Sequence, residues 1–138
     1  MTAYLTFRVA DGQYAVPLAR MREIVPLPPL TRVPTTSPMM RGLFNRIGQI
    51  VPVLDVSMHL GFGETAVDAR SCVAIAEVPL NGEPVTLGVL VGEIGDVVEL
   101  SAADPIFRLL DLEQLVTSLA APFAGRLAVH SVQEAICR

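Results

Sequence analysis

Histidine and cysteine are the side chains of this chain best suited to bind a metal ion or act as a nucleophile, and they are few. The sequence has two histidines, His59 and His130, and two cysteines, Cys72 and Cys137. His130 and Glu134 would share one face of a helix, but two groups do not make a metal site. Two cysteines do not make a disulfide framework or a zinc site either. The sequence therefore predicts neither a metal ion nor a cofactor.

The segment Gly61–Ala66 has the letters G-x-G-x-x-A of a dinucleotide-binding fingerprint. That motif must follow a strand and open a helix. Here it follows a predicted helix, Val56–Leu60, and precedes a loop, so we interpret it as a helix stop and a turn. The chain also has no nucleophile elbow and no phosphate-binding loop. We expect no enzyme; a hydrolase that uses His59 or His130 is the most distant alternative.

Two aspartates, Asp55 and Asp111, stand where an apolar strand gives way to a short amphipathic helix. An N-cap, in which the carboxylate accepts backbone N–H groups of the first helical turn, is the simplest role for each. The segments around them also resemble one another, because Val53–Val56 and Leu109–Leu112 both lead into such a helix. This internal echo predicts two related β lobes.

The composition favours a protein that binds other proteins. Hydrophobic residues make up 51% of the chain and charged residues 17%, against a typical charged share of roughly 25%. Part of this apolar surface is expected to meet a partner. The net charge is −4 and no basic cluster occurs, which argues against nucleic acid. Apolar runs stay well short of the ~18 residues of a membrane span, and the start of the chain lacks signal-peptide features, so we expect a cytoplasmic protein without direct membrane insertion.

Short apolar segments separated by turn residues predict a mostly β protein with short helices. Asn45–Gly48 has the residues of a tight reversal, and Pro52 indicates an edge or bulge position in the strand that follows. Met21, Ile24 and Val25 lie at helical spacing and predict a short helix that ends at Pro26. Strands are predicted at 4–9, 14–18, 50–54, 71–78, 85–91, 96–100 and 106–110, and further helices at 56–60 and 112–119.

The order of these motifs resembles the CheW family, the coupling proteins of bacterial chemotaxis. The blocks that carry the resemblance are Tyr14–Leu18, Met21–Ile24, Arg32–Pro34 with Pro38, Gly42–Asn45, Gly48–Val56, and Leu87–Val91 with Asp96 and Val97. Together they cover the chain from Tyr4 to about Leu100. The middle block is fairly specific to the family.

The resemblance implies one CheW-like domain over residues 1–138, built as two small SH3-like five-stranded β-barrel lobes packed together with short helices. The approximate lobes are 1–65, with C-terminal contributions, and 66–138. It implies a non-enzymatic adaptor, associated with receptor arrays at the inner membrane. One barrel would bind the regulatory domain of the chemotaxis histidine kinase, and the groove between barrels the cytoplasmic tip of a chemoreceptor. The alternative is a small-molecule-binding sensory or regulatory β-barrel, which would need a closed apolar pocket with a few convergent polar groups.

The residues expected to contact a partner lie on either side of the spaced prolines. They are Met21, Glu23, Ile24, Gly42, Asn45, Arg46 and Ile47. Gly42 is included because a side chain there would block close approach of a partner's backbone. The family usually reads Asn-Leu-Arg-Gly at the central turn, whereas here Ile47 holds the arginine position and Arg46 precedes it. A shift by one residue sends a side chain to the opposite side of a strand.

A second departure from the family concerns the connection Ser101–Pro105, which is shorter than usual and lacks a strand. The second lobe is then incomplete, with an exposed edge, unless another segment covers it. The tail segment Arg126–Val129 has a strand-like pattern. It would complete the lobe of its own chain or, by swapping, that of a second copy in a homodimer.

Overall fold

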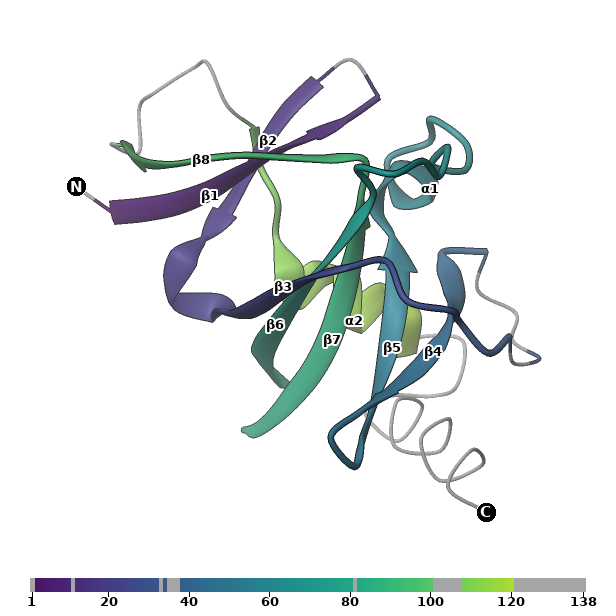
Figure 1. Ribbon diagram of the computed structural model, residues 1–138. Helices are drawn as coiled ribbons and strands as arrows, with labels where there is room; N and C mark the ends of the chain where they lie inside the picture. The colour runs from purple at the N-terminus through teal and green to yellow at the C-terminus, as the bar shows by residue number, and fades with distance from the viewer. Residues whose placement is uncertain are drawn as a thin grey trace.

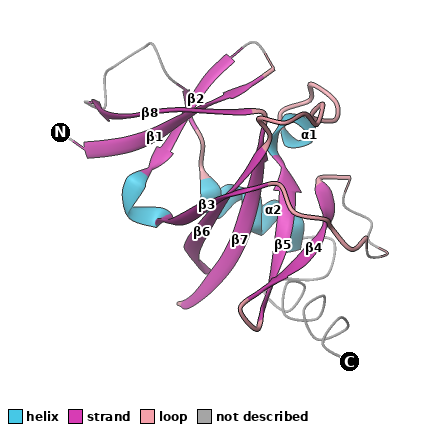
Figure 2. Cartoon of the chain, viewed as in Figure 1, coloured by secondary structure: helices cyan, strands magenta, loops and turns pink. Residues whose placement is uncertain are grey.

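The computed structural model describes residues 2–10, 12–32, 34, 38–80, 82–100 and 108–120. The described chain consists mostly of strands, which form two sheets (Figures 1 and 2). Sheet A has the order β8 (Glu93–Leu100), β1 (Thr2–Val9), β2 (Gly12–Pro17), β9 (Arg108–Leu109). Sheet B has the order β3 (Met21–Pro26), β6 (Cys72–Leu80), β7 (Glu83–Val91), β5 (Gln49–Asp55), β4 (Met40–Arg46). The helices are η1 (Leu18–Arg20), α1 (Val56–His59) and α2 (Leu112–Ala120).

Both predicted aspartate caps are confirmed. The backbone N–H of Ser57 donates to Asp55 at the start of α1, at 3.0 Å, and that of Gln114 donates to Asp111 at the start of α2, also at 3.0 Å. Each bond satisfies an N–H group that has no partner within its own helix. The helices predicted at 56–60 and 112–119 are therefore confirmed, with ends within one residue of those expected.

The helix predicted from Met21, Ile24 and Val25 is wrong. These residues belong to strand β3, which pairs antiparallel with β6, and only η1 immediately before them is helical. A register shift between Met21 and Glu23 interrupts the strand. A bulge of this kind breaks strict two-residue alternation, which is why the apolar spacing resembles that of a helix.

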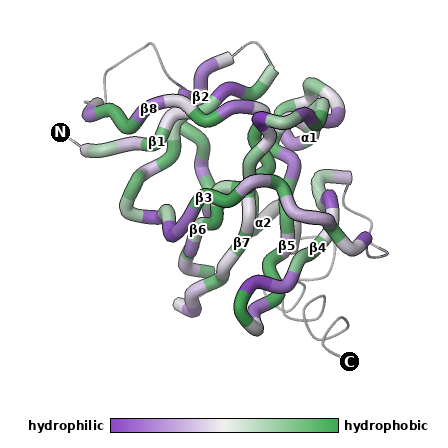
Figure 3. The backbone as a smooth tube through the Cα atoms, viewed as in Figure 1, coloured by the Kyte–Doolittle hydropathy of each residue, from purple (hydrophilic) through white to green (hydrophobic). Residues whose placement is uncertain are grey.

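One hydrophobic core joins the two sheets and α2. Leu5, Phe7 and Val16 of sheet A, Leu54 and Leu87 of sheet B, and Leu115 of α2 are all at most 3% exposed and belong to one cluster. Figure 3 colours the backbone by hydropathy, and hydrophobic residues predominate along β5, β6 and β7, the inner strands of sheet B. Consecutive residues of these strands are buried, which is typical of strands covered on both faces.

The expected pair of five-stranded barrels is wrong in the part of the chain that the structure describes. Sheet A has four strands, sheet B has five, and neither closes into a barrel. The two edge strands of sheet B are β3 and β4. Beyond the end of β3, Thr31 forms an isolated bridge to Leu43 of β4, with N···O distances of 2.8 and 2.9 Å. Strands of sheet B come from both sides of residue 65, where the lobes were expected to divide.

Pro52 lies in an inner strand rather than at an edge. Strand β5 is flanked by β7 and β4. Its ladder with β7 begins only at Val53, opposite Gly88, so the missing N–H of Pro52 interrupts no bond to β7. Some expectations fall outside the described residues: the strand Arg126–Val129, the connection Ser101–Pro105, and the side chains of His130, Glu134 and Cys137.

Candidate functional site

Strands β3 and β4 carry most of the expected contact residues, and they lie at opposite ends of the strand order of sheet B. An ion pair between Arg46 of β4 and Glu23 of β3 links these two edges. The side chain of Arg46 is 30% exposed and that of Glu23 is 41% exposed. The pair brings Glu23 and Arg46 together, although they are far apart in sequence. We give the name β3–β4 surface to the expected contact residues on these two strands and on the turn that follows β4: Met21, Glu23, Ile24, Asn45, Arg46 and Ile47.

The turn between β4 and β5 holds a strained apolar residue at its tip. Arg46 pairs with Gln49, so Ile47 and Gly48 are the two central residues of the hairpin turn. Both have positive φ, 49° and 75°, as a type I′ turn requires. Glycine adopts this conformation readily, but for a β-branched residue it is an outlier. Ile47 is also 90% exposed, so burial in this chain does not compensate the strain.

Asn45 and Gly42 have roles within the chain. The side-chain oxygen of Asn45 accepts the backbone N–H of Gly48 at 3.1 Å and so stabilises the turn. Gly42 is buried, with φ of +150°. A Cβ built on it would lie 2.9 Å from both the Leu30 Cβ and the Thr31 carbonyl oxygen. The close backbone approach expected at Gly42 is therefore made by the chain's own 30–31 segment.

Ile24 and Met21 differ in exposure. Ile24 is 42% exposed and lies on edge strand β3, where no described strand pairs with the side away from β6. Met21 is partly buried and packs against the main core. Of the expected apolar contacts, Ile24 and Ile47 are therefore the accessible ones.

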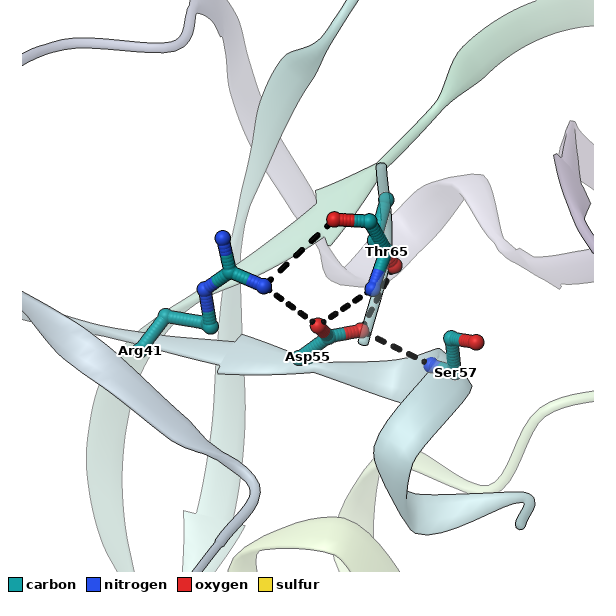
Figure 4. Close-up of polar contacts among 4 residues, drawn as sticks. All are labelled: Arg41, Asp55, Ser57 and Thr65. Atoms are coloured by element: carbon teal, nitrogen blue, oxygen red, sulfur yellow. Dashed lines mark hydrogen bonds and ion pairs between the residues drawn. The ribbon is translucent and has the colours of Figure 1, made fainter. Parts of the chain in front are cut away.

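A buried polar cluster supports this part of sheet B, and the sequence shows only its N-cap member. Asp55 is fully buried and accepts four hydrogen bonds (Figure 4): from Arg41 Nη1 at 3.0 Å, Ser57 N at 3.0 Å, Thr65 N at 2.9 Å and Thr65 Oγ1 at 2.6 Å. The cluster fastens the loop after α1 to strands β4 and β5. Arg41 and Thr65 do not stand at a sequence spacing that would predict contact with Asp55. The cluster therefore could not be predicted from the sequence.

The described residues offer little for chemistry on small molecules. No three His, Cys, Asp or Glu side chains among them gather to hold a metal ion. Two depressions of about 340 and 350 Å³ are open to solvent. The first is lined by Tyr4, Pro17, Leu109 and Leu112 with charged Arg20, Asp111 and Glu113. Neither is the closed apolar pocket that a ligand-binding barrel would need. No helix of the described chain is long and apolar enough to cross a membrane.

The sequence of the chain was compared with models of known protein families. Residues 3–120 match the model of the CheW-like domain. The chain belongs to the CheW-like domain family. The resemblance drawn from the sequence blocks is thereby confirmed.

Curated relatives of the family carry chemotaxis names. The chain is 28% identical over 104 residues to the probable chemotaxis protein CheW of Rhizobium etli, an alignment that covers 75% of this chain and 63% of the relative. It is 28% identical over 100 residues to the chemotaxis protein CheW of Rhizobium meliloti, covering 72% of this chain and 62% of the relative. The chain thus spans less than two thirds of the length of these relatives.

A solved structure of the family has a similar fold. The scaffolding protein TtCheW from Thermoanaerobacter tengcongensis matches with a TM-score of 0.65 and 24% identity, over 73% of this chain and 66% of that chain. At the central turn, the arginine of this chain, Arg46, stands one residue before the position where the family usually has arginine, and Ile47 holds that position. Arg46 is held in an ion pair with Glu23, while Ile47 occupies the exposed tip.

Proposed function

We propose that this chain is a non-enzymatic adaptor that couples chemoreceptors to the chemotaxis histidine kinase. Membership of the CheW-like domain family supports the proposal, together with the chemotaxis names of the relatives. The observation that carries it on this chain is the β3–β4 surface. There, an ion pair joins the two edge strands and an apolar side chain stands exposed at the tip of the turn, and the two depressions of about 340 and 350 Å³ are open to solvent.

The proposed contact residues fall into two groups. Ile24 and Ile47 would supply apolar contacts to a partner, and Glu23 and Arg46 would supply polar ones; protein interfaces combine both kinds. Met21, Gly42 and Asn45 act from within, by packing behind the surface and by shaping the turn. The partners proposed are the regulatory domain of the kinase and the cytoplasmic tip of the receptor. This places the protein in the cytoplasm, at receptor arrays of the inner membrane.

Calorimetric titration tests the proposal. The chain is titrated against a purified kinase regulatory domain and, separately, against a receptor tip fragment. We expect saturable binding to both, and a loss of about tenfold or more in affinity for at least one of them when Ile47 is changed to Asp, because a charge would be buried in an apolar contact.

The matched control is Val67→Asp. Val67 is 51% exposed and lies in the loop that follows α1, which begins at the end of β5 opposite the Ile47 turn. This variant should bind as the unmodified chain does. A folded protein that binds neither partner would contradict the adaptor function, whereas equal losses in both variants would contradict the assignment of the surface.

A further inference from the structure

The depression of about 350 Å³ lies where the two sheets meet the loop that follows α1. It is lined by the end of β1, by Ser57 of α1, by residues of that loop from Phe62 to Asp68, and by Gly92, which joins β7 to β8. None of the six residues of the β3–β4 surface lines it. A depression of this size can hold a small molecule or a single side chain.

Ser57 brings a hydroxyl group without a partner to this depression. The residue is only 5% exposed. Its hydroxyl oxygen forms no hydrogen bond with any described residue and points away from the Asp55 cluster (Figure 4). No fully enclosed side-chain oxygen of the described chain lacks a partner, so this hydroxyl is open to the depression that Ser57 lines. Because polar groups in buried residues are normally hydrogen-bonded, the free hydroxyl indicates a place for a ligand.

The charges around the depression leave one carboxylate unpaired, that of Glu64. Arg8 pairs with Glu93 at 2.8 Å, and Glu93 also lies 3.8 Å from Arg70. Arg70 in turn lies 3.7 Å from Asp68. These two cations and two anions balance one another, whereas no described residue forms an ion pair with Glu64. The depression therefore has an excess negative charge and favours a cation.

Phe62 supplies an aromatic ring to the same depression. The residue is 54% exposed. Aromatic faces attract cations, and a planar guanidinium also stacks on them, which a compact ammonium does not. A guanidinium has five N–H donors and no acceptor, which matches the two unoccupied acceptors, the Glu64 carboxylate and the Ser57 hydroxyl.

We propose that this depression binds an alkylguanidinium group, the side chain of arginine. The guanidinium pairs with Glu64, stacks on Phe62 and donates a hydrogen bond to the Ser57 hydroxyl. The site lies outside the β3–β4 surface, so the inference stands independently of the proposed chemotaxis partners.

Titration of the full-length chain with guanidinium compounds, followed by NMR shifts of the backbone amides, tests the proposal. The probes are arginine capped at both ends, free arginine, and citrulline, whose side chain has a similar shape without the charge. We expect saturable shifts in the loop after α1 and at Gly92 with capped arginine, and none with citrulline. Glu64→Gln should weaken binding by about threefold or more, as expected for the loss of one exposed charge pair. Glu99→Gln is the control, because it makes the same change on an exposed residue of β8 that does not line the depression.

Ser57→Ala separates a ligand contact from a structural one. Since no described residue bonds to the hydroxyl, its removal should leave the free energy of unfolding unchanged while it weakens the binding of arginine. Tighter binding of capped than of free arginine identifies a polypeptide as the source of the side chain, and equal or tighter binding of free arginine shows that the amino acid itself is accepted. Either result, with the effects of the variants, supports the site.

Three outcomes would overturn the site. The first is the absence of saturable shifts with both arginine probes. The second is equal binding of citrulline, which would show that charge plays no part. The third is an affinity that neither Glu64→Gln nor Ser57→Ala changes relative to Glu99→Gln.

Discussion

Arg46 and Glu23 form an ion pair between the two edge strands of sheet B, although three strands separate β3 from β4 in the sheet order. Together with the Thr31–Leu43 bridge, this pair holds the open edges of the sheet near each other. Because the arginine of the central turn stands one residue earlier than is usual in the family, Arg46 contacts Glu23, and the apolar Ile47 lies at the tip of the turn.

The Arg46–Glu23 pair is expected to contribute little to stability and more to the shape of the surface. Both side chains are partly exposed, and such pairs are typically worth about 0.2–1 kcal/mol. Chemical denaturation of Arg46→Ala, Glu23→Ala and the double variant should give a coupling energy of about 0.5 kcal/mol, which decreases at high salt. A coupling energy near zero at low salt would show that the two charges do not interact in solution.

Ile47 should be replaceable with a gain in stability. A positive φ costs an L-residue roughly 1–2 kcal/mol, and asparagine tolerates it better than a β-branched residue does. Ile47→Asn should therefore raise the free energy of unfolding by about 1 kcal/mol, measured by urea denaturation. Ile24→Asn is the matched control, because the same change is made on an exposed strand residue for which no positive φ is found. An equal effect of the two changes would contradict the strain.

Gly42 should tolerate no side chain for a reason internal to the chain. In Gly42→Ala the new methyl group would meet the Leu30 Cβ and the Thr31 carbonyl oxygen, each at 2.9 Å. Forcing these groups apart typically costs about 1–3 kcal/mol. Gly92→Ala is the control, since its Cβ would meet nothing within 4 Å and its φ is not positive. If both variants unfold at the same urea concentration, the close approach at Gly42 does not exist in solution.

Sequence patterns predict the turns and helix caps of this fold better than they predict whether its sheets close into barrels. Turn chemistry at Asn45–Gly48 and the caps at Asp55 and Asp111 depend on neighbours within a few residues, and all three are confirmed. The β3 segment was misleading because a bulge changes the spacing of its apolar residues. Whether a sheet closes depends on pairing between segments that are far apart, which periodicity does not encode.

The β3–β4 surface likewise combines features that the sequence predicts with contacts that only the folded chain shows. The exposed apolar residues Ile24 and Ile47 are visible in the sequence as expected contacts. The Arg46–Glu23 pair and the Arg41–Asp55 pair join residues from different strands, so only the folded chain reveals them. The buried state of Gly42 is likewise a consequence of the segment after β3 crossing over it.

The two cap aspartates, similar in sequence context, should respond very differently to the same isosteric change. Asp55 is fully buried and accepts from Arg41, Thr65 and Ser57, whereas Asp111 is exposed. In Asp55→Asn an amide N–H₂ must face donors, and Arg41 loses its counter-charge, which typically costs about 3 kcal/mol or more. Asp111→Asn should change stability by less than about 0.5 kcal/mol, because asparagine caps helices as well as aspartate does.

Urea denaturation of the two variants measures this difference directly. A second readout isolates the loop after α1, which Thr65 ties to Asp55. Trypsin should cleave after Arg70, an exposed residue near the end of that loop, faster in Asp55→Asn than in Asp111→Asn under native conditions. Because local opening governs such cleavage, a faster cut at Arg70 without a matching loss of global stability would show that the cluster holds only the loop. Equal stabilities and equal cleavage rates in the two variants would contradict the role assigned to the buried carboxylate.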